Sequence, residues 1–196
     1  MTRPSVSVVV LAGGRSARFG RDKLAEPIDG RPLLRHAIDA VRPLAIEVLV
    51  VVSPGANPAV PAGTRLVHDP AEFEGPLAGL VTGLRAAREA IVLVVAGDMP
   101  EPVPAVLERL IAALDDDAID VAVLEQAGRP RPLPMAVRRA SAAAIAERVF
   151  NAGERRLRAM LDTPRAAVLP EAAWRVLDPL GATMRDIDTP ADMAGP

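Results

Sequence analysis

A pair of glycines follows an apolar run near the start of the chain, and cations come directly after it. Residues 6–11 are almost entirely aliphatic and β-branched, which is typical of a strand buried on both faces of a parallel sheet. Gly13 and Gly14 then remove two Cβ atoms, so a ligand can approach their backbone N–H groups closely. The cations that follow are Arg15, Arg18, Arg21 and Lys23. Amides and cations at the carboxyl end of a strand suit a polyphosphate.

Two well-known phosphate loops do not fit this segment. A P-loop follows the pattern G-x-x-x-x-G-K-S/T. Here five residues separate Gly14 from Gly20, and Arg-Asp-Lys follows. The dinucleotide fingerprint G-x-G-x-x-G is absent as well. From the residues alone, an ordinary turn with solvated cations stays open as an alternative. The preference of α/β proteins for ligand sites at the carboxyl ends of strands favours the phosphate site.

A single carboxylate follows another apolar run, at residues 91–96. Asp98 comes directly after Gly97, and Pro100 stiffens the backbone beyond it. Asp98 is a candidate ligand for Mg²⁺, which prefers one or two carboxylates together with substrate phosphates. From the residues alone, a cap at the amino end of a helix is the favoured alternative. A polyphosphate loop on a neighbouring strand favours the metal.

Apolar runs that alternate with helical patterns must position these groups. We expect strands at residues 6–11, 47–52, 65–68, 91–96, 119–124 and 166–169, and helices at 33–41, 78–90, 103–114, 141–150 and 154–161. Ser141 is a plausible N-cap, whereas the proline-rich residues 129–134 indicate an extended loop before a strand resumes at 135–137. This alternation predicts one α/β domain over residues 1–196, with a three-layer, Rossmann-like, mostly parallel sheet and helices on both faces.

Composition excludes several classes of function. The net charge of −2 gives no global basic field for nucleic acid, and aromatic residues make up 2% of the chain. Cysteine is absent, so thiolate metal sites and cysteine nucleophiles are excluded. The apolar runs are far shorter than the roughly 20 residues of a membrane span. We therefore expect a soluble, cytoplasmic protein without nucleic-acid or membrane partners.

The segment from Leu11 to Lys23 resembles the opening signature of the nucleotidyltransferase family that includes molybdenum cofactor guanylyltransferases. It reads Leu-Ala-Gly-Gly-x-Ser-x-Arg-Phe-Gly-x-Asp-Lys. In that family the loop holds a nucleoside triphosphate. The resemblance thus implies nucleotide contacts along this segment, at Leu11, Ala12, Gly13, Gly14 and Lys23.

Four further blocks extend the resemblance over nearly the whole chain. They lie at residues 68–80, 97–100, 152–157 and 186–190. The second block recognises the guanine and ribose side of GTP in relatives, and Asp69 matches its aspartate. Asp98 matches the magnesium ligand of the family's Asp-x-Pro motif. Both residues are therefore implied nucleotide contacts, and Asp98 is the implied metal ligand.

The half of the motif set attributed to pterin binding departs from the family pattern. Relatives often carry Asn where Asp186 and Asp188 stand. They also tend to show a His-Pro segment where this chain has Arg131-Pro132. These two acids add negative charge close to a phosphorylated substrate. That charge is unfavourable for binding unless one of the acids helps to bind metal. The nucleotide half therefore matches better than the acceptor half.

The resemblance implies a Mg²⁺-dependent transfer of GMP from GTP to molybdopterin, with release of pyrophosphate. Lys23, Arg18 and Asp98 are the implied catalytic residues, and brief contacts with molybdoenzymes or cofactor-synthesis proteins are implied partners. Two alternatives stay open. One is a related nucleotidyltransferase that uses CTP or another phosphorylated acceptor, and Gly13 favours GTP because cytidylyl relatives often have Ala there. The other is a non-catalytic nucleotide-binding adaptor.

Overall fold

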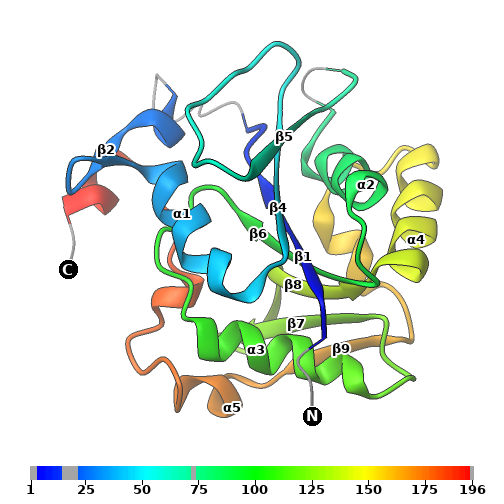
Figure 1. Ribbon diagram of the computed structural model, residues 1–196. Coiled ribbons are helices and arrows are strands. Elements are labelled where there is room, and N and C mark those ends of the chain that lie inside the picture. Colours follow the sequence, from blue (N-terminus) through cyan, green and yellow to red (C-terminus); the bar gives the residue numbers. More distant parts are fainter. Residues whose placement is uncertain (1–3, 15–21, 72–73, 195–196) are drawn as a thin grey trace.

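Seven strands form one sheet in the computed structural model, which describes residues 4–14, 22–71 and 74–194 (Figure 1). The strand order is β5-β4-β1-β6-β8-β7-β9. Every neighbouring pair is parallel except the two that involve β8. The predicted mostly parallel sheet is therefore confirmed. The strands are β1 (Val6–Leu11), β4 (Glu47–Val52), β5 (Thr64–His68), β6 (Ile91–Ala96), β7 (Val121–Gln126), β8 (Arg129–Arg138) and β9 (Ala166–Leu169).

Helices cover both faces of this sheet (Figure 1). The α-helices are α1 (Leu33–Val41), α2 (Pro76–Ala86), α3 (Pro104–Ala112), α4 (Arg139–Asn151) and α5 (Glu171–Arg175). Short 3-10 helices lie at Lys23–Ala25, Arg42–Leu44, Ala113–Asp115, Leu157–Leu161, Ala182–Met184 and Pro190–Ala194, and β2 (Pro27–Ile28) pairs with β3 (Arg31–Pro32) in a small hairpin. In the part of the chain that the structure describes, no helix is long and apolar enough to cross a membrane.

Strand β1 shows how one central strand serves two cores. Val8 and Val10 belong to a core cluster that includes residues of α1 and α3 and the Trp174 side chain of α5. Val9 belongs to the cluster on the other face, which includes residues of α2 and α4. Successive side chains of a strand alternate between faces, so an unbroken aliphatic run is what a strand buried on both sides requires. The sequence pattern of residues 6–11 is explained by this position.

The prediction of a loop at residues 129–134 is wrong, because β8 begins at Arg129. Its first residues pair with β7 alone, and its ladder with β6 begins only at Met135. On that open edge the missing N–H of Pro130 costs no ladder hydrogen bond. The register shifts between Val123 and Leu124 of β7, which leaves residues 132–134 as a bulge.

Several helix boundaries also differ from the prediction, and the helix expected at 154–161 is a 3-10 helix over Leu157–Leu161. Two of the differences have a visible cause. Helix α4 begins at Arg139 without a side-chain cap, so Ser141 is not its N-cap. The Ser141 side chain instead interacts with the buried carboxylate of Asp120. Helix α2 ends at Ala86 rather than at residue 90. The N–H of Ala87 still donates to the Gly83 carbonyl oxygen, but the N–H of Arg88 leaves the helix and donates to Glu47 Oε1 at 2.6 Å.

Candidate nucleotide site

The carboxyl ends of four parallel strands bring the predicted chemical groups to one edge of the sheet. Backbone hydrogen bonds continue the ladder past the strand ends, from Ala12 N to Val51 O at 2.8 Å and from Gly97 N to Leu11 O at 2.9 Å. A third bond of 2.9 Å runs from Asp69 N to Val52 O. The backbones that lead to the glycine pair, Asp69 and Asp98 are thus held side by side, at the edge where open α/β sheets bind ligands.

The glycine pair lies at this edge in two different environments. A Cβ on Gly13 would lie 3.6 Å from Ser53 Oγ and 3.7 Å from Asp69 Oδ2, whereas one on Gly14 would meet none of the described residues within 4 Å. Among the residues that the structure describes, none therefore crowds the backbone of Gly14. The N–H of Ala12 and the carbonyl of Leu11 are already used in the ladder. These two groups of Leu11 and Ala12 therefore hold the loop in place and are not available to hydrogen-bond a nucleotide.

The ammonium group of Lys23 joins residues from distant parts of the chain. Its Nζ donates hydrogen bonds to Asp98 Oδ2 at 2.6 Å and to Asp188 Oδ1 at 3.3 Å. A third bond, of 3.0 Å, goes to the Ile187 carbonyl oxygen. The side chains of Lys23 and Asp98 are 14% and 21% exposed, so the pair is shielded but open to solvent on one side. The structure thus brings two of the three predicted catalytic residues into contact.

A small apolar cluster holds this group of charges in position. Leu33 and Ile187 are fully buried and pack with Leu24, Ile28 and Met193. The cluster fixes the residue that follows Lys23 and the residue that precedes Asp188. The backbone N–H of Ile187 also donates to the Asp98 carbonyl oxygen at 3.0 Å. Lys23, Asp98 and the segment at 186–190 are therefore tied together by backbone and core contacts as well as by charge.

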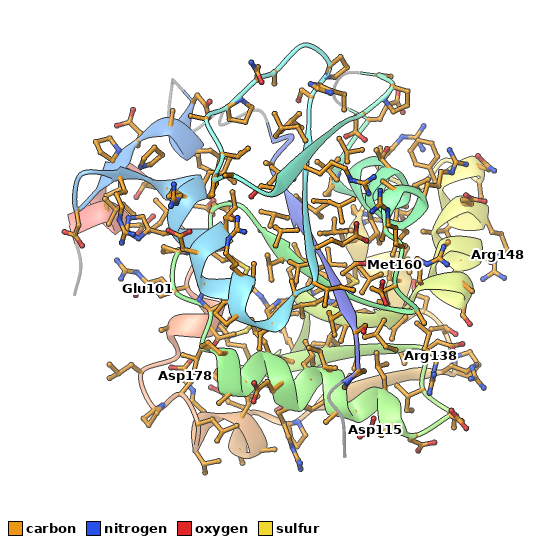
Figure 2. All side chains as sticks on the ribbon, viewed as in Figure 1. Glu101, Asp115, Arg138, Arg148, Met160 and Asp178 are labelled. Carbon is orange, nitrogen blue, oxygen red and sulfur yellow. The ribbon has the colours of Figure 1, made fainter. Side chains whose placement is uncertain are left out.

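The segment after Asp188 is held by Asp192, whose carboxylate forms one half of a capping box. Asp192 Oδ2 accepts hydrogen bonds from Thr189 N at 2.7 Å and from Thr189 Oγ1 at 2.9 Å. Arg185, on the other side, donates to the Asp192 carbonyl oxygen and lies 3.7 Å from Glu101 Oε2, which Figure 2 labels. These contacts fix Asp186 and Asp188 beside the Asp98 loop.

The charges around Lys23 keep it protonated. Burial by itself lowers the pKa of a lysine, but hydrogen bonds and charges from Asp98 and Asp188 outweigh that effect and raise the pKa of Lys23 above its ordinary value. A permanent cation next to Asp98 suits the stabilisation of negative charge that develops on transferred phosphates.

Asp69 is the other charged group of this edge, and its setting is apolar. Its Oδ1 is buried without a hydrogen-bond partner among the described residues. Burial raises the pKa of Asp69, and the Thr82 side chain acts in the opposite direction with less effect. Its Oδ2 lies against two glycines, since a Cβ on Gly79 would be 3.6 Å away. A buried acceptor without a donor, beside two residues that lack side chains, indicates a place for a ligand that brings its own N–H groups.

Ser53 belongs to the same edge and was missed by the sequence reasoning. It follows β4, and its Oγ donates to the Gly13 carbonyl oxygen at 3.2 Å. The signal was available, because Ser53 comes directly after a buried apolar run, as Gly97-Asp98 does. A serine at a strand end is a weaker signal than a glycine pair or a carboxylate, because its hydroxyl carries no charge and occurs in many turns.

The carboxylates at Asp98 fit a magnesium ion for which substrate phosphates supply the remaining ligands. Asp98 and Asp188 both direct carboxylate oxygens at one ammonium group. Oxygen ligands of this kind, one or two in number, are what Mg²⁺ takes from protein in phosphate-transfer sites. Among the described residues, no three His, Cys, Asp or Glu side chains gather closely enough to form a metal cage without substrate.

A cleft of about 1090 Å³ opens beside Asp98, on the side away from β1. Its wall is the first half of β8, and its lining includes Asp98, Arg131, Leu133, Arg158 and Asp186. Burial raises the pKa of Asp186, and the charges of Asp188 and Asp98 add to that effect. The two departures from the family pattern thus meet here, since Arg131 and Asp186 line the same cleft. Arg18, the third predicted catalytic residue, lies outside the described residues together with Arg15 and Arg21.

Comparison with known proteins agrees with this arrangement. Residues 8–168 match the family model described as the MobA-like NTP transferase domain. A relative from Chloroflexus aggregans, named as a probable molybdenum cofactor guanylyltransferase, is 38% identical over 193 residues, which cover 96% of this chain and 91% of the relative. A molybdenum cofactor guanylyltransferase from Burkholderia ambifaria is 37% identical over 167 residues, covering 80% of this chain and 81% of the relative.

Solved structures share the architecture. Molybdopterin-guanine dinucleotide biosynthesis protein A from Archaeoglobus fulgidus superposes on this chain with a TM-score of 0.80, over 96% of this chain and 95% of that one. The two sequences are 24% identical. At that identity the superposition shows a common fold, and the argument for activity comes from the residues at the carboxyl edge and from the sequence relatives.

Proposed function

The chain belongs to the MobA-like NTP transferase family of nucleotidyltransferases, and from this premise we propose that it transfers GMP from GTP to molybdopterin. The products are the guanine dinucleotide form of the cofactor and pyrophosphate. The reaction takes place in the cytoplasm, and enzymes that use the dinucleotide cofactor take up the product. The relatives named as molybdenum cofactor guanylyltransferases, at 37% and 38% identity, support this choice of substrates.

The observation that carries the proposal is the contact between Lys23 and Asp98, 2.6 Å apart at the carboxyl edge of the sheet. A protonated lysine and a carboxylate at the mouth of a cleft are the groups that nucleotidyl transfer uses. Lys23 offsets the charge of the triphosphate and of the leaving pyrophosphate. Gly13 and Gly14 offer backbone amides to the phosphates, and Arg18 adds a second cation.

Asp98 is the proposed ligand for Mg²⁺, with Asp188 within reach of the same ammonium group. When bound, the ion would neutralise negative charge on the transferring phosphate oxygens. The bonds of Lys23 to Asp188 and to the Ile187 carbonyl oxygen hold the ammonium group at the same edge of the sheet.

Positioning accounts for most of the mechanism, because phosphate nucleophiles are already ionised at neutral pH. The terminal phosphate of the acceptor attacks the α-phosphorus of GTP in line, one P–O bond forms, and the bond to pyrophosphate breaks. The fixed edge of the sheet holds the triphosphate, and the cleft beside Asp98 holds the acceptor. Oriented reactants and preorganised charges are the main sources of acceleration in such a transfer.

Asp69 is the proposed reader of guanine. Its buried Oδ1 lacks a donor among the described residues. Guanine offers two neighbouring donors, N1–H and the 2-amino group, and an ionised carboxylate can accept both. Cytosine presents a single exocyclic amino donor at its corresponding edge. A site with a buried carboxylate therefore prefers GTP, because CTP leaves an acceptor oxygen unpaired.

Release of pyrophosphate tests the proposal. Purified protein is incubated with Mg²⁺ and either GTP or CTP, with and without molybdopterin. We expect release only with GTP and molybdopterin together. Release with CTP and molybdopterin identifies a cytidylyltransferase. If GTP binds but no pyrophosphate is released in the complete mixture, transfer to molybdopterin is contradicted. Other phosphorylated acceptors are then tested: release with one of them identifies a different acceptor, and release with none supports a non-catalytic adaptor.

A further inference from the structure

Arg131 and Asp186 face each other across the cleft beside Asp98. Arg131 Nη2 lies 3.8 Å from Asp186 Oδ2, beyond hydrogen-bond distance, and the two side chains are 45% and 47% exposed. Both residues line the cleft. The contact is therefore a loose ion pair, and the donors of the guanidinium group stay available to a ligand.

The backbone under Arg131 is fixed, although its side chain is not. Arg131 pairs with Leu124 of β7, directly before the bulge of residues 132–134. Arg175, which lines the same cleft, is differently placed: it pairs with Glu171 at 3.0 Å and lies over the Trp174 ring at 4.8 Å. Arg175 is thus part of the wall, whereas Arg131 is a cation on a rigid support with a weakly held head group.

Carboxylates make this part of the cleft negatively charged, so an anionic acceptor needs a cation there. Asp98 and Asp188 both contact Lys23, and Asp186 is close enough to these two carboxylates for their charges to add to burial in raising its pKa. A phosphorylated acceptor that enters this region meets repulsion from Asp186. Arg131 is the cation that Asp186 faces, so it can offset that repulsion where the acceptor enters.

We propose that Arg131 binds the anionic phosphate of the acceptor, and that Asp186 is a weak competitor that pairs with the Arg131 head group in the cleft until the phosphate replaces it. The exchange is favourable because a half-exposed ion pair contributes little, whereas a guanidinium and a phosphate form charge-assisted, bidentate hydrogen bonds. This inference rests on the proposed function, since it assigns a residue to the acceptor side of that reaction.

Binding of the acceptor to single variants tests this exchange. With GTP replaced by a non-hydrolysable analogue, the dissociation constants of molybdopterin and of its dephosphorylated form are measured. Arg131→Ala should weaken binding of molybdopterin about tenfold or more, as expected for loss of a charged hydrogen bond, and leave the dephosphorylated form unchanged. Asp186→Asn should tighten binding of molybdopterin up to about fivefold, because it removes a weak competitor. The double variant should still bind molybdopterin more weakly than the wild type, because loss of the Asp186 charge removes repulsion but does not replace the guanidinium group.

The control is Arg85→Ala, an exposed arginine on α2 that pairs with Glu147 at 2.8 Å, away from the cleft. It should bind both forms as the wild type does, and thermal unfolding should show all variants folded. Equal losses of both forms in Arg131→Ala, or wild-type binding of both, overturn the role of Arg131. Weaker binding in Asp186→Asn overturns the role of Asp186 as a competitor.

Failure of the proposed function gives a different result. Wild-type protein that binds neither form of molybdopterin contradicts molybdopterin as the acceptor and says nothing against Arg131. Inorganic phosphate then serves as the probe, with the GTP analogue still in place. A phosphate affinity about fivefold or more weaker in Arg131→Ala than in the wild type keeps the inference, and equal affinities overturn it.

Discussion

Lys23 Nζ lies 2.6 Å from Asp98 Oδ2, although the two residues are 75 positions apart in the chain. Lys23 begins a 3-10 helix after the glycine loop, and Asp98 follows β6, which pairs directly with β1. The contact therefore joins the two signature motifs that the sequence shows separately. Asp188 and the Ile187 carbonyl oxygen complete the environment of the ammonium from the far end of the chain.

Removal of either member of this pair should reduce transfer without unfolding the protein. We expect Lys23→Ala and Asp98→Asn each to lower kcat by about 10²–10³-fold, the effect of removing one preorganised electrostatic group. Steady-state release of pyrophosphate at saturating Mg²⁺ measures this. Arg35→Ala, which breaks an exposed ion pair with Asp39 on α1, is the control and should keep wild-type rates. Near-normal turnover of Asp98→Asn would show that this carboxylate holds no essential ion.

Asp69 should determine the choice of nucleotide. In Asp69→Asn the amide group presents a donor as well as an acceptor, so we expect GTP to bind about tenfold more weakly, with a smaller preference over CTP. Isothermal titration with both nucleotides measures this. Binding of GTP to the wild type should also weaken as the pH falls, beginning above the ordinary pKa of an aspartate, because burial raises the pKa of Asp69. An unchanged ratio of GTP to CTP affinity in the variant excludes Asp69 as the reader of the base.

Asp69→Asn should increase the stability of the protein, although it weakens the binding of GTP. Since the pKa of Asp69 is higher in the folded protein than in the unfolded chain, the carboxylate costs stability as the pH rises through the folded pKa. Asp69→Asn should therefore be more stable than the wild type at pH 7, by about 1 kcal/mol, and the gain should disappear near pH 3.5. Urea unfolding at both pH values measures the difference, with Asp39→Asn as the surface control. A variant that is less stable at pH 7 would mean that Asp69 is satisfied in the folded protein.

The fold and the nucleotide edge were predictable because both depend on local patterns. An aliphatic run such as Val6–Leu11 fits a strand buried on both faces, and parallel strands place their carboxyl ends together. Asp98 was a candidate because it follows such a run, and the resemblance to the family's Asp-x-Pro motif supported it. Its N-cap alternative is not observed, since α3 begins only at Pro104 and its N-cap residue is Val103.

The acceptor side was less predictable because it depends on long-range pairing. The prolines at 130, 132 and 134 indicate a loop when only the sequence is considered. They are tolerated in a strand because this part of β8 extends past the end of its ladder with β6. The pairing of Arg131 with Asp186 joins residues 55 positions apart, and no local pattern indicates it. The Ser141 error has the same cause, since a hydroxyl that fits a cap interacts with Asp120 from another part of the chain.

Gly75 should be required for stability at the start of α2, where the backbone of Arg155 packs against it. Its φ is +86°, and an added Cβ would lie 2.9 Å from the Arg155 carbonyl oxygen, which accepts a 3.1 Å hydrogen bond from Leu77 N. We expect Gly75→Ala to lower the free energy of unfolding by about 2–3 kcal/mol, from the backbone strain and the displaced carbonyl together. Urea denaturation measures this.

Gly153→Ala is the matched control for this substitution. Gly153 has a similar φ of +94°, but a Cβ there would meet nothing within 4 Å. It should lose only the conformational part, about 1 kcal/mol. Equal losses in the two variants would show that the Arg155 carbonyl moves aside without cost.

Asp120 should stabilise the fold at the end of the sheet opposite to the site. It is 4% exposed at the start of β7, and Arg165 holds it with two hydrogen bonds of 2.5 and 3.2 Å. The bonds to Arg165 lower the pKa of Asp120 and outweigh burial, so its contribution is complete above the ordinary aspartate pKa and is lost as the pH falls through the folded pKa. We expect Asp120→Ala to cost about 3 kcal/mol at pH 7 and less below pH 4.

Asp117 provides the comparison for this prediction, because it is close in sequence and also pairs with an arginine. Its side chain is 99% exposed and lies 2.9 Å from Arg138, which Figure 2 labels near the end where β1 begins. Asp117→Ala should change the free energy of unfolding by less than about 0.5 kcal/mol, because water already solvates that carboxylate. Both variants should bind GTP as the wild type does, since neither residue lies at the carboxyl edge. A small loss in Asp120→Ala, equal to that of Asp117→Ala, would show that Arg165 compensates for the missing carboxylate by moving into solvent.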